Sequence, residues 1–377
     1  MANSPYTFRD LTPQRADASL RAYWQQLADA SPSAEAIYQT PAFFDFLCDT
    51  AHAGQTPYLY GAYRSGQAQL LGLIALQHQR RASAVARWQH GEQLVILGSG
   101  VLMPPQPDPP ITPITPIPAA HSTLLPALHA FLLEQFRHAQ ALVYRALPAS
   151  DPAWQALQQE RSALLPLHLH GWRDCHYLNL PPSYADYLAQ LGSKRRYNLK
   201  RQQRLLSEQA GAALRVLAIE HPAQLEALQQ ALAQCCSSVQ RAQLWDGAEL
   251  QALAQHGLLL CYRIDAGCQP CGIVLGLHRD GVYHVFNILP DPRWQALSAG
   301  TTLLQLALAD LCDRRQCHRL EFGYGSPAPA HHAGNQTSRR SHLLLMRRNW
   351  RNHLRYVAQT LQTGLRTLAT RYRQGVH

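Results

Sequence analysis

A carboxylate followed by two glycines is the chain's first candidate for proton transfer. Glu321 lies in the segment 320–325, Leu-Glu-Phe-Gly-Tyr-Gly, which we expect to be a strand. A carboxylate at the mouth of a site can act as a general base when burial raises its pKa. Tyr324 could donate a proton to a leaving thiolate. The alternative is a structural glutamate paired with a nearby arginine. His284 and Asn287, on the preceding predicted strand, are further catalytic and substrate-binding candidates.

Small residues open the apolar helix that precedes this strand. Residues 295–302 read Gln-Ala-Leu-Ser-Ala-Gly-Thr-Thr. Small side chains let backbone N–H groups approach a phosphate, and the start of a helix adds partial positive charge. The cofactor-binding candidates here are therefore Gln295, Ser298, Ala299, Gly300 and Thr301. The competing interpretation is that Ser298 or Thr301 is simply an N-cap.

A basic helical segment comes before both motifs. Residues 193–204 contain six lysines and arginines and no acidic residue. A helix of this kind is either a solvated surface or a surface that binds an anion, such as the phosphates of a cofactor, a lipid or a nucleic acid. Arg196 is the candidate cofactor ligand. Tyr197 could stack on a base or close a substrate pocket.

These residues lie in a unit that the chain contains twice. Each copy has a predicted hairpin (58–64 with 70–77; 258–264 with 272–278, joined by a turn at 265–270), a further strand (93–97; 282–289), an apolar helix (123–137; 301–315) and a short strand (141–146; 319–323). A repeated supersecondary unit indicates two copies of one domain. The order hairpin, strand, helix, strand is typical of α/β acyl-transfer domains. The helix of the first copy lacks the small-residue turn, so the second copy is the better cofactor site.

Composition sets bounds on the class of protein. A chain of 377 residues can form two cores, and 46% hydrophobic with 15% charged residues excludes a largely disordered chain. No apolar run reaches the roughly 18 residues of a spanning helix, and the polar start lacks a secretory signal. We therefore expect a cytoplasmic protein. The nine irregularly spaced cysteines predict reduced thiols, leave the role of Cys268 and Cys271 open, and suggest no metal site.

The net charge of +10 is concentrated at the C-terminus. Residues 339–377 contain nine arginines and no acidic residue. Apolar residues recur at helical spacing from Trp350 to Tyr372, so this tail predicts a basic amphipathic helix. Its apolar side could contact an anionic membrane peripherally, at the inner face, or could pack on the protein's own core.

The second half, from Cys175 to about Leu345, resembles the CelD/BcsL-like branch of GNAT acetyltransferases, which is related to Fem-type aminoacyltransferases. The resemblance is carried by a helix leading into the basic stretch, by the Ser-Ala-Gly turn at 298–300 and by the segment 321–325. The family's usual acid is aspartate, where this chain has Glu321. The family's tyrosine-lysine pair is absent, and His331 or His332 could replace it. Beyond these histidines, Asn335 and Arg339 could line the acceptor side.

The resemblance implies an α/β fold of two tandem GNAT-like domains. Residues 1–170 would form a degenerate first domain, 171–345 a second domain with a helical insert at 183–256, and 346–377 the basic helix. The implied enzyme transfers an acyl group from acyl-CoA to an amine or hydroxyl of a sugar or of a cell-envelope polysaccharide precursor. Backbone N–H groups of 285–287 would stabilise the oxyanion. One alternative is a Fem-type transferase that uses aminoacyl-tRNA, in which the basic residues would contact RNA. The other is a non-catalytic membrane-surface adaptor of a polysaccharide synthase.

Overall fold

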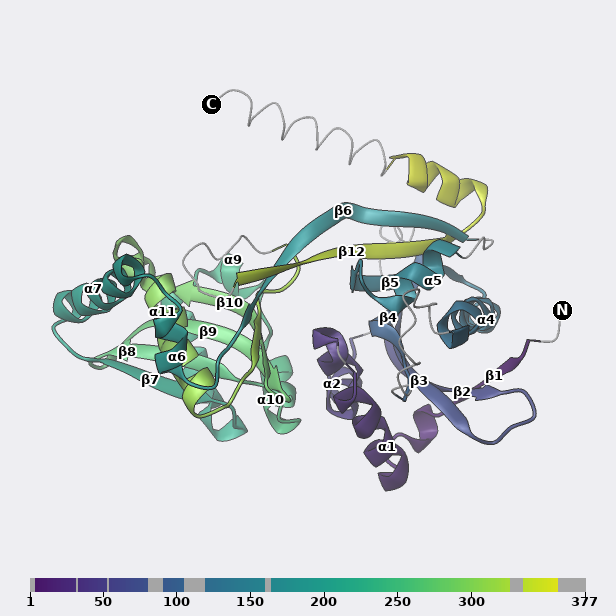
Figure 1. The fold of residues 1–377 in the computed structure, drawn as a ribbon, viewed down its shortest axis with the longest axis horizontal. Coiled ribbons are helices and arrows are strands. Elements are labelled where there is room, and N and C mark those ends of the chain that lie inside the picture. The colour runs from purple at the N-terminus through teal and green to yellow at the C-terminus, as the bar shows by residue number, and fades with distance from the viewer. Residues whose placement is uncertain are drawn as a thin grey trace. The chain divides into compact units, whose positions relative to one another are not determined.

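The computed structural model describes residues 4–31, 33–52, 54–80, 91–104, 119–159, 164–325 and 335–358. The chain divides into two compact units (Figure 1). Unit 1 consists of residues 1–173 together with 339–377, and unit 2 of residues 174–338. Among the described helices, none is both long enough and apolar enough to cross a bilayer.

Unit 1 is a mixed sheet with helices packed against it. Its elements are β1 (Tyr6–Asp10), η1 (Thr12–Gln14), α1 (Ala18–Asp29), η2 (Ala34–Gln39), α2 (Pro41–Asp49), β2 (Gln55–Arg64), β3 (Leu70–Gln79), β4 (Glu92–Leu102), α4 (Ala119–Gln135), β5 (Ala139–Pro148), α5 (Pro152–Gln159), the first part of β6 (Leu164–Asn179) and most of β12 (Asn335–Arg347). The strand order is β1-β2-β3-β4-β5-β12-β6. The β4–β5 pair is parallel, and β12 runs antiparallel to β5.

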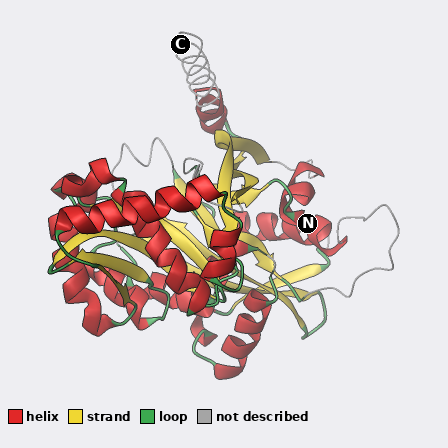
Figure 2. Ribbon diagram, turned by 60° about the vertical axis from the view of Figure 1, so that its left-hand side comes forward, coloured by secondary structure: helices red, strands yellow, loops and turns green. Residues whose placement is uncertain are grey.

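Unit 2 repeats this plan. Its elements are the last part of β6, α6 (Tyr184–Ala189), α7 (Ser193–Ala210), β7 (Leu214–Ile219), η3 (Pro222–Gln224), α8 (Leu225–Cys235), α9 (Ser238–Arg241), α10 (Gly247–Gln255), β8 (Cys261–Ala266), β9 (Gln269–Arg279), β10 (Val282–Pro290), η4 (Pro292–Leu297), α11 (Ala299–Asp313) and β11 (Arg319–Glu321). The strand order is β7-β8-β9-β10-β11-β6, and β10 and β11 are parallel. Helices lie against this sheet in both views (Figures 1 and 2).

The repeat is more extensive than the sequence predicted. Residues 183–256 were expected to form a purely helical insert, but they contain β7, which pairs with β8 as β1 pairs with β2. Helices α8 and α10 then follow β7 as α1 and α2 follow β1. Among the described elements of unit 1, α6, α7 and η4 have no counterpart. The sequence of β7, Leu-Arg-Val-Leu-Ala-Ile, suits a helix as well as a strand. It is a strand because it pairs with β8.

Two boundaries also differ from those predicted. The second hairpin turn is shorter than 265–270, because β8 continues to Ala266 and β9 begins at Gln269. Gly267 lies in this turn with a left-handed backbone, φ +62°. In addition, Leu343–Met346 of β12 pair with Ala141–Tyr144 of β5, so this segment belongs to unit 1 and not to the C-terminal domain.

Helix α11 is the central element of unit 2. Its leucines, among them Leu303, Leu304, Leu308 and Leu311, are buried in one cluster with residues of β8, β9, β10 and β11. Burial of so many large apolar side chains contributes roughly 1.5–3 kcal/mol each. This packing holds the start of α11 close to the end of β10.

Candidate active site

The sheet of unit 2 opens where β10 and β11 separate. Their parallel pairing covers only three positions, Val282 with Arg319, Tyr283 with Leu320 and His284 with Glu321. Beyond these positions β11 ends, and the Phe322 N–H instead donates to the His176 carbonyl of β6 at 3.1 Å. From residue 285 onward, the described strand partner of β10 lies on the β9 side alone. A strand edge without a strand partner can offer its backbone groups to an extended ligand.

A β-bulge sits at the start of this open edge. The register between β10 and β9 shifts between Val285 and Asn287, so Phe286 is the extra residue. Phe286 is 43% exposed, and its ring stacks on Trp245 with centroids 4.1 Å apart. Bulges often redirect side chains beside active sites. The aromatic pair forms an apolar wall next to the open edge.

The turn into α11 has the geometry of an anion site. Ser298 is left-handed, with φ 56° and ψ 37°, and its side chain makes no cap hydrogen bond. The interpretation of Ser298 as a side-chain N-cap is therefore wrong. Thr301 N–H and Thr302 N–H both donate to the Ser298 carbonyl, at 3.1 and 3.2 Å. Among the described residues other than Ala296, no backbone acceptor pairs with the N–H of Ala299 or Gly300, and N–H groups at a helix start of this kind suit a phosphate.

Two further observations are compatible with a phosphate at this turn. The hydroxyl of Thr302 is buried, 3% exposed for the residue, and has no hydrogen-bond partner among the described residues. At Gly300, an added Cβ would meet only Ile288 Cγ2 and Pro290 Cγ, both at 3.8 Å. The fold itself therefore does not require glycine at this position. Gln295 is exposed, and its carbonyl accepts from Ser298 N–H at 3.1 Å.

Ser298→Gly should stabilise the protein. A non-glycine residue in the left-handed region costs roughly 1–2 kcal/mol. Glycine removes this cost, but about half of the gain is offset because glycine loses more chain entropy on folding. We expect the free energy of unfolding to rise by about 0.5–1 kcal/mol, measured by urea denaturation, with coenzyme A affinity unchanged within about threefold. Ser298→Val is the opposite control and should destabilise. A glycine variant no more stable than the parent would show that this backbone is not strained.

Glu321 is an ion-paired carboxylate in the structure. It is 1% exposed, and Arg319 contacts its Oε1 through Nη2 at 2.5 Å and Nε at 2.7 Å. The Arg319 guanidinium also lies 3.8 Å from the centre of the Tyr177 ring. A base must contact the acceptor's proton, whereas Oε1 of this carboxylate is held by the Arg319 guanidinium. The geometry therefore favours the structural alternative for Glu321.

His284 lies at the point where the strands separate. The β10–β11 register places it opposite Glu321, and the residue is 7% exposed. Asn287 follows the bulge and is half-buried. Tyr324 is also half-buried and lies between Gly323 and Gly325, which both have positive φ. His284 thus combines a side chain able to accept a proton near neutral pH with a position at the open edge.

The basic helix α7 packs against η4 and α11. The guanidinium of Arg196 is engaged by the end of α6, since its Nη1 donates to the carbonyls of Leu188, Ala189 and Leu191 at 3.3, 3.4 and 2.9 Å. Arg196 therefore holds α6 in place, which does not support its predicted contact with a cofactor. Tyr197 is 65% exposed. The remaining cations of α7 form an exposed surface on the helix that adjoins the turn into α11.

Of the remaining predicted acceptor residues, only Arg339 has a described side chain. His331 and His332 lie outside the described residues, as does the side chain of Asn335. Arg339 belongs to unit 1, where its guanidinium lies 5.3 Å from the centre of the Trp172 ring. Cys271 is buried, which raises the pKa of its thiol to about 11, and Cys268 is exposed. Within the described part of the chain, no group of three or more histidine, cysteine or acidic side chains is arranged to hold a metal.

The equivalent place in unit 1 is filled. The β4–β5 pairing ends at Ile96 with Tyr144, and β4 then bulges before it rejoins β3. The side chain of Gln39 is fully buried there and donates to the Gly100 carbonyl at 2.7 Å. A Cβ added at Gly98 would lie 2.6 Å from the same side chain. The opening that unit 2 presents is thus closed in unit 1, which agrees with one site per chain.

Comparison with known proteins identifies the domain. Residues 193–329 match the family model described as the acetyltransferase (GNAT) domain. Over this segment the chain has the fold of GNAT acetyltransferase domains. The segment contains α7, the open edge of β10, the turn into α11 and β11, so the geometric candidates all lie inside it. The chain is accordingly an enzyme of the acyltransferase class. A search of the curated proteins found no matching sequence.

Two solved structures with TM-scores above 0.5 show a similar fold over nearly the whole chain. A crystal structure of FemX has a TM-score of 0.58 at 8% identity, covering 90% of this chain and 98% of that one. A conserved protein of unknown function from Bacteroides thetaiotaomicron has a TM-score of 0.52 at 11% identity, covering 90% and 99%. A tandem GNAT protein from the clavulanic acid biosynthesis pathway has a TM-score of 0.49 at 12% identity, covering 91% and 99%. At these identities the likeness concerns the fold. The predicted α/β fold of two GNAT-like domains is confirmed.

Proposed function

We propose that unit 2 transfers an acyl group from acyl-CoA to an amine or hydroxyl of a saccharide or cell-envelope precursor. The observation that carries this proposal is the left-handed turn at Ser298, beside the open edge of β10, where the N–H groups of Ala299 and Gly300 have no backbone acceptor among the described residues other than Ala296. A pyrophosphate at the helix start and an extended thiol arm along the strand edge would use both features together.

In the proposed reaction the acceptor attacks the thioester directly. The acceptor nitrogen or oxygen bonds to the carbonyl carbon while His284 takes its proton. Backbone N–H groups at the bulge, residues 285–287, stabilise the oxyanion. The carbon–sulfur bond then breaks, and the thiolate receives a proton from Tyr324, which is reprotonated through His284. The Arg319–Glu321 pair keeps β11 in register beside His284 and does not exchange the proton itself.

The acceptor class is supported by the aromatic wall. Sugar rings present C–H groups that pack on flat aromatic side chains, and Trp245 with Phe286 offers such a surface at the bulge. The resemblance to CelD/BcsL-like proteins points to the same class of acceptor.

One observation favours a second candidate function. The exposed cations of α7, with Tyr197 65% exposed among them, would suit the phosphates and a base of an aminoacyl-tRNA. In that case the donor would be the aminoacyl ester of tRNA, and α7 would carry the affinity. Binding would then weaken steeply with salt.

Titration calorimetry separates the two donors. We expect coenzyme A and acetyl-CoA to bind with one site per chain, and tRNA to bind only at low salt. Turnover is then followed as thiol release with a panel of amino sugars and polyols. Tight tRNA binding at physiological salt, with no heat from coenzyme A, would overturn the acyl-CoA proposal in favour of the tRNA donor.

A further inference from the structure

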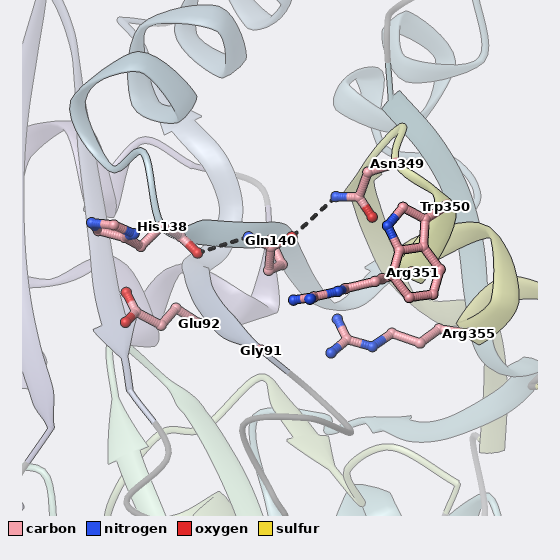
Figure 3. A pocket seen from close by; sticks show the side chains of 8 residues that line it. All are labelled: Gly91, Glu92, His138, Gln140, Asn349, Trp350, Arg351 and Arg355. Atoms are coloured by element: carbon pink, nitrogen blue, oxygen red, sulfur yellow. Dashed lines mark hydrogen bonds between the residues drawn. The ribbon is translucent and has the colours of Figure 1, made fainter. Parts of the chain in front are cut away.

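A pocket lies in unit 1, where the chain leaves β12. It has a volume of about 490 Å³ and is lined by Gly91, Glu92, His138, Gln140, Asn349, Trp350, Arg351 and Arg355 (Figure 3). Figure 3 shows the guanidinium groups of Arg351 and Arg355 extending from the helix toward the strand that carries Glu92. None of these residues belongs to the acyltransferase site.

The charge in this pocket is predominantly positive. Arg351 and Arg355 are four residues apart on one helix, where like charges destabilise each other. Among the described residues, no carboxylate forms an ion pair with Arg351. Glu92 already contacts Arg80 and His78, each at 3.2 Å. Burial and the neighbouring Arg351 lower the pKa of Arg355. An anion held between the two guanidinium groups would relieve this repulsion.

The helix at 350–358 attaches to unit 1 through the side that carries Asn352 and Tyr356. Asn352 is fully buried, and its Nδ2 donates to the carbonyls of Arg347 at 2.9 Å and Gln140 at 3.4 Å. Asn349 caps the helix by accepting from Asn352 N–H at 2.9 Å. One turn later, Tyr356 packs against the cluster that contains Val95 and Leu344. The attachment of the helix is therefore satisfied without its apolar stripe.

That apolar stripe remains exposed. Trp350, Leu354 and Val357 are 68%, 61% and 53% exposed, and their spacing places them on one side of the helix. Arg351 and Arg355 lie on the flank between this stripe and the attached side. The prediction that the tail packs its apolar side on the protein's own core is thus wrong for the described turns of the helix.

We propose that this surface binds an anionic phospholipid bilayer, with a lipid phosphate seated between Arg351 and Arg355 and the stripe of Trp350, Leu354 and Val357 inserted beside it. The two arginines and the apolar stripe together favour a bilayer as the ligand. Soluble phosphates need the cations but not the stripe, whereas a bilayer surface supplies anionic phosphates and an apolar layer next to each other. Tryptophan at the rim of the pocket also suits the headgroup level of a membrane.

The test is co-sedimentation of the full chain with vesicles of phosphatidylglycerol and phosphatidylcholine. We expect binding to mixed vesicles, little binding to pure phosphatidylcholine, and a partition coefficient about thirtyfold lower for Arg351→Gln/Arg355→Gln. The matched control, Arg9→Gln/Arg64→Gln, removes the same charge from exposed positions of β1 and β2 and should bind like the parent. Arg351→Gln alone is the fallback if the double variant does not fold.

A second measurement tests insertion of the stripe. Brominated lipids should quench the fluorescence of the parent more than that of Trp350→Phe, and Leu354→Ser should weaken vesicle binding even at high salt. Equal loss in the two double-arginine variants would show general charge attraction and overturn the pocket. Binding of glycerol phosphate at millimolar concentration, without any vesicle binding, would identify a soluble phosphate as the ligand. Binding to tRNA but not to vesicles would identify RNA as the ligand. Either result would overturn the membrane assignment while leaving acyl transfer by unit 2 untouched.

Discussion

Gly300→Asp should weaken the binding of coenzyme A about a hundredfold or more without destabilising the protein. The structure has room for the side chain, since an added Cβ meets nothing closer than 3.8 Å. An acidic residue in the first turn favours the helix by roughly 0.3–1 kcal/mol. The same carboxylate would repel a pyrophosphate and compete for the N–H groups of Ala299 and Gly300. Losing two charge-assisted hydrogen bonds, each worth about 1.5–3 kcal/mol, gives at least that hundredfold change.

The variant is expected to lose affinity for coenzyme A without losing stability, so general damage to the fold cannot produce this result. Titration calorimetry measures the affinity, and thermal or urea denaturation measures the stability. Gly300→Ala should bind coenzyme A within about threefold of the parent and be slightly more stable. Ala42→Asp, which adds the same charge near the start of α2 in unit 1, should leave affinity unchanged. If a folded Gly300→Asp protein binds normally, this turn does not hold the donor's phosphates.

The repeat and its core could be predicted because they depend on the spacing of apolar residues within short segments. The two hairpins carry runs of alternating and continuous apolar residues, and the helix after each is apolar on nearly every side, as α11 proves to be. The strand β7 was not found, because its leucines and alanine fit either period and its partner β8 comes more than forty residues later. Pairing between distant segments, and not local preference, makes this segment a strand.

The candidate site was predicted at the level of residue types but not of backbone. The small residues at 298–300 indicated a phosphate turn, yet the left-handed conformation of Ser298 depends on how η4 meets α11. The aromatic wall was missed because Trp245 and Phe286 are distant in sequence and meet only through the bulge. The exposed aromatic on β10 was the one available signal. For Glu321, the arginine two positions earlier could have indicated the ion pair, since residues i and i+2 share a face of a strand.

The two candidates for the base, His284 and Glu321, should respond differently to substitution. His284→Gln should keep coenzyme A affinity and lower kcat by about 10²–10⁴-fold. An imidazole must be neutral to accept a proton, so the parent's activity should fall toward acidic pH as His284 becomes protonated. In His284→Gln this acidic limb should disappear. The measurement is a pH–rate profile of thiol release with the best acceptor from the amino-sugar panel.

Glu321→Gln should instead act through stability. Removing one member of a buried ion pair leaves Arg319 without its carboxylate, at a cost of about 3 kcal/mol. Arg319→Gln, the matched variant, should cost a similar amount. At a temperature where both remain folded, we expect each to keep the acidic limb and to lose less than tenfold in kcat. The reverse pattern, a stable Glu321→Gln protein without the acidic limb beside a normally active His284→Gln, would make Glu321 the base. The register of β10 with β11 would then serve to bring the acceptor to Glu321, with His284 as its neighbour.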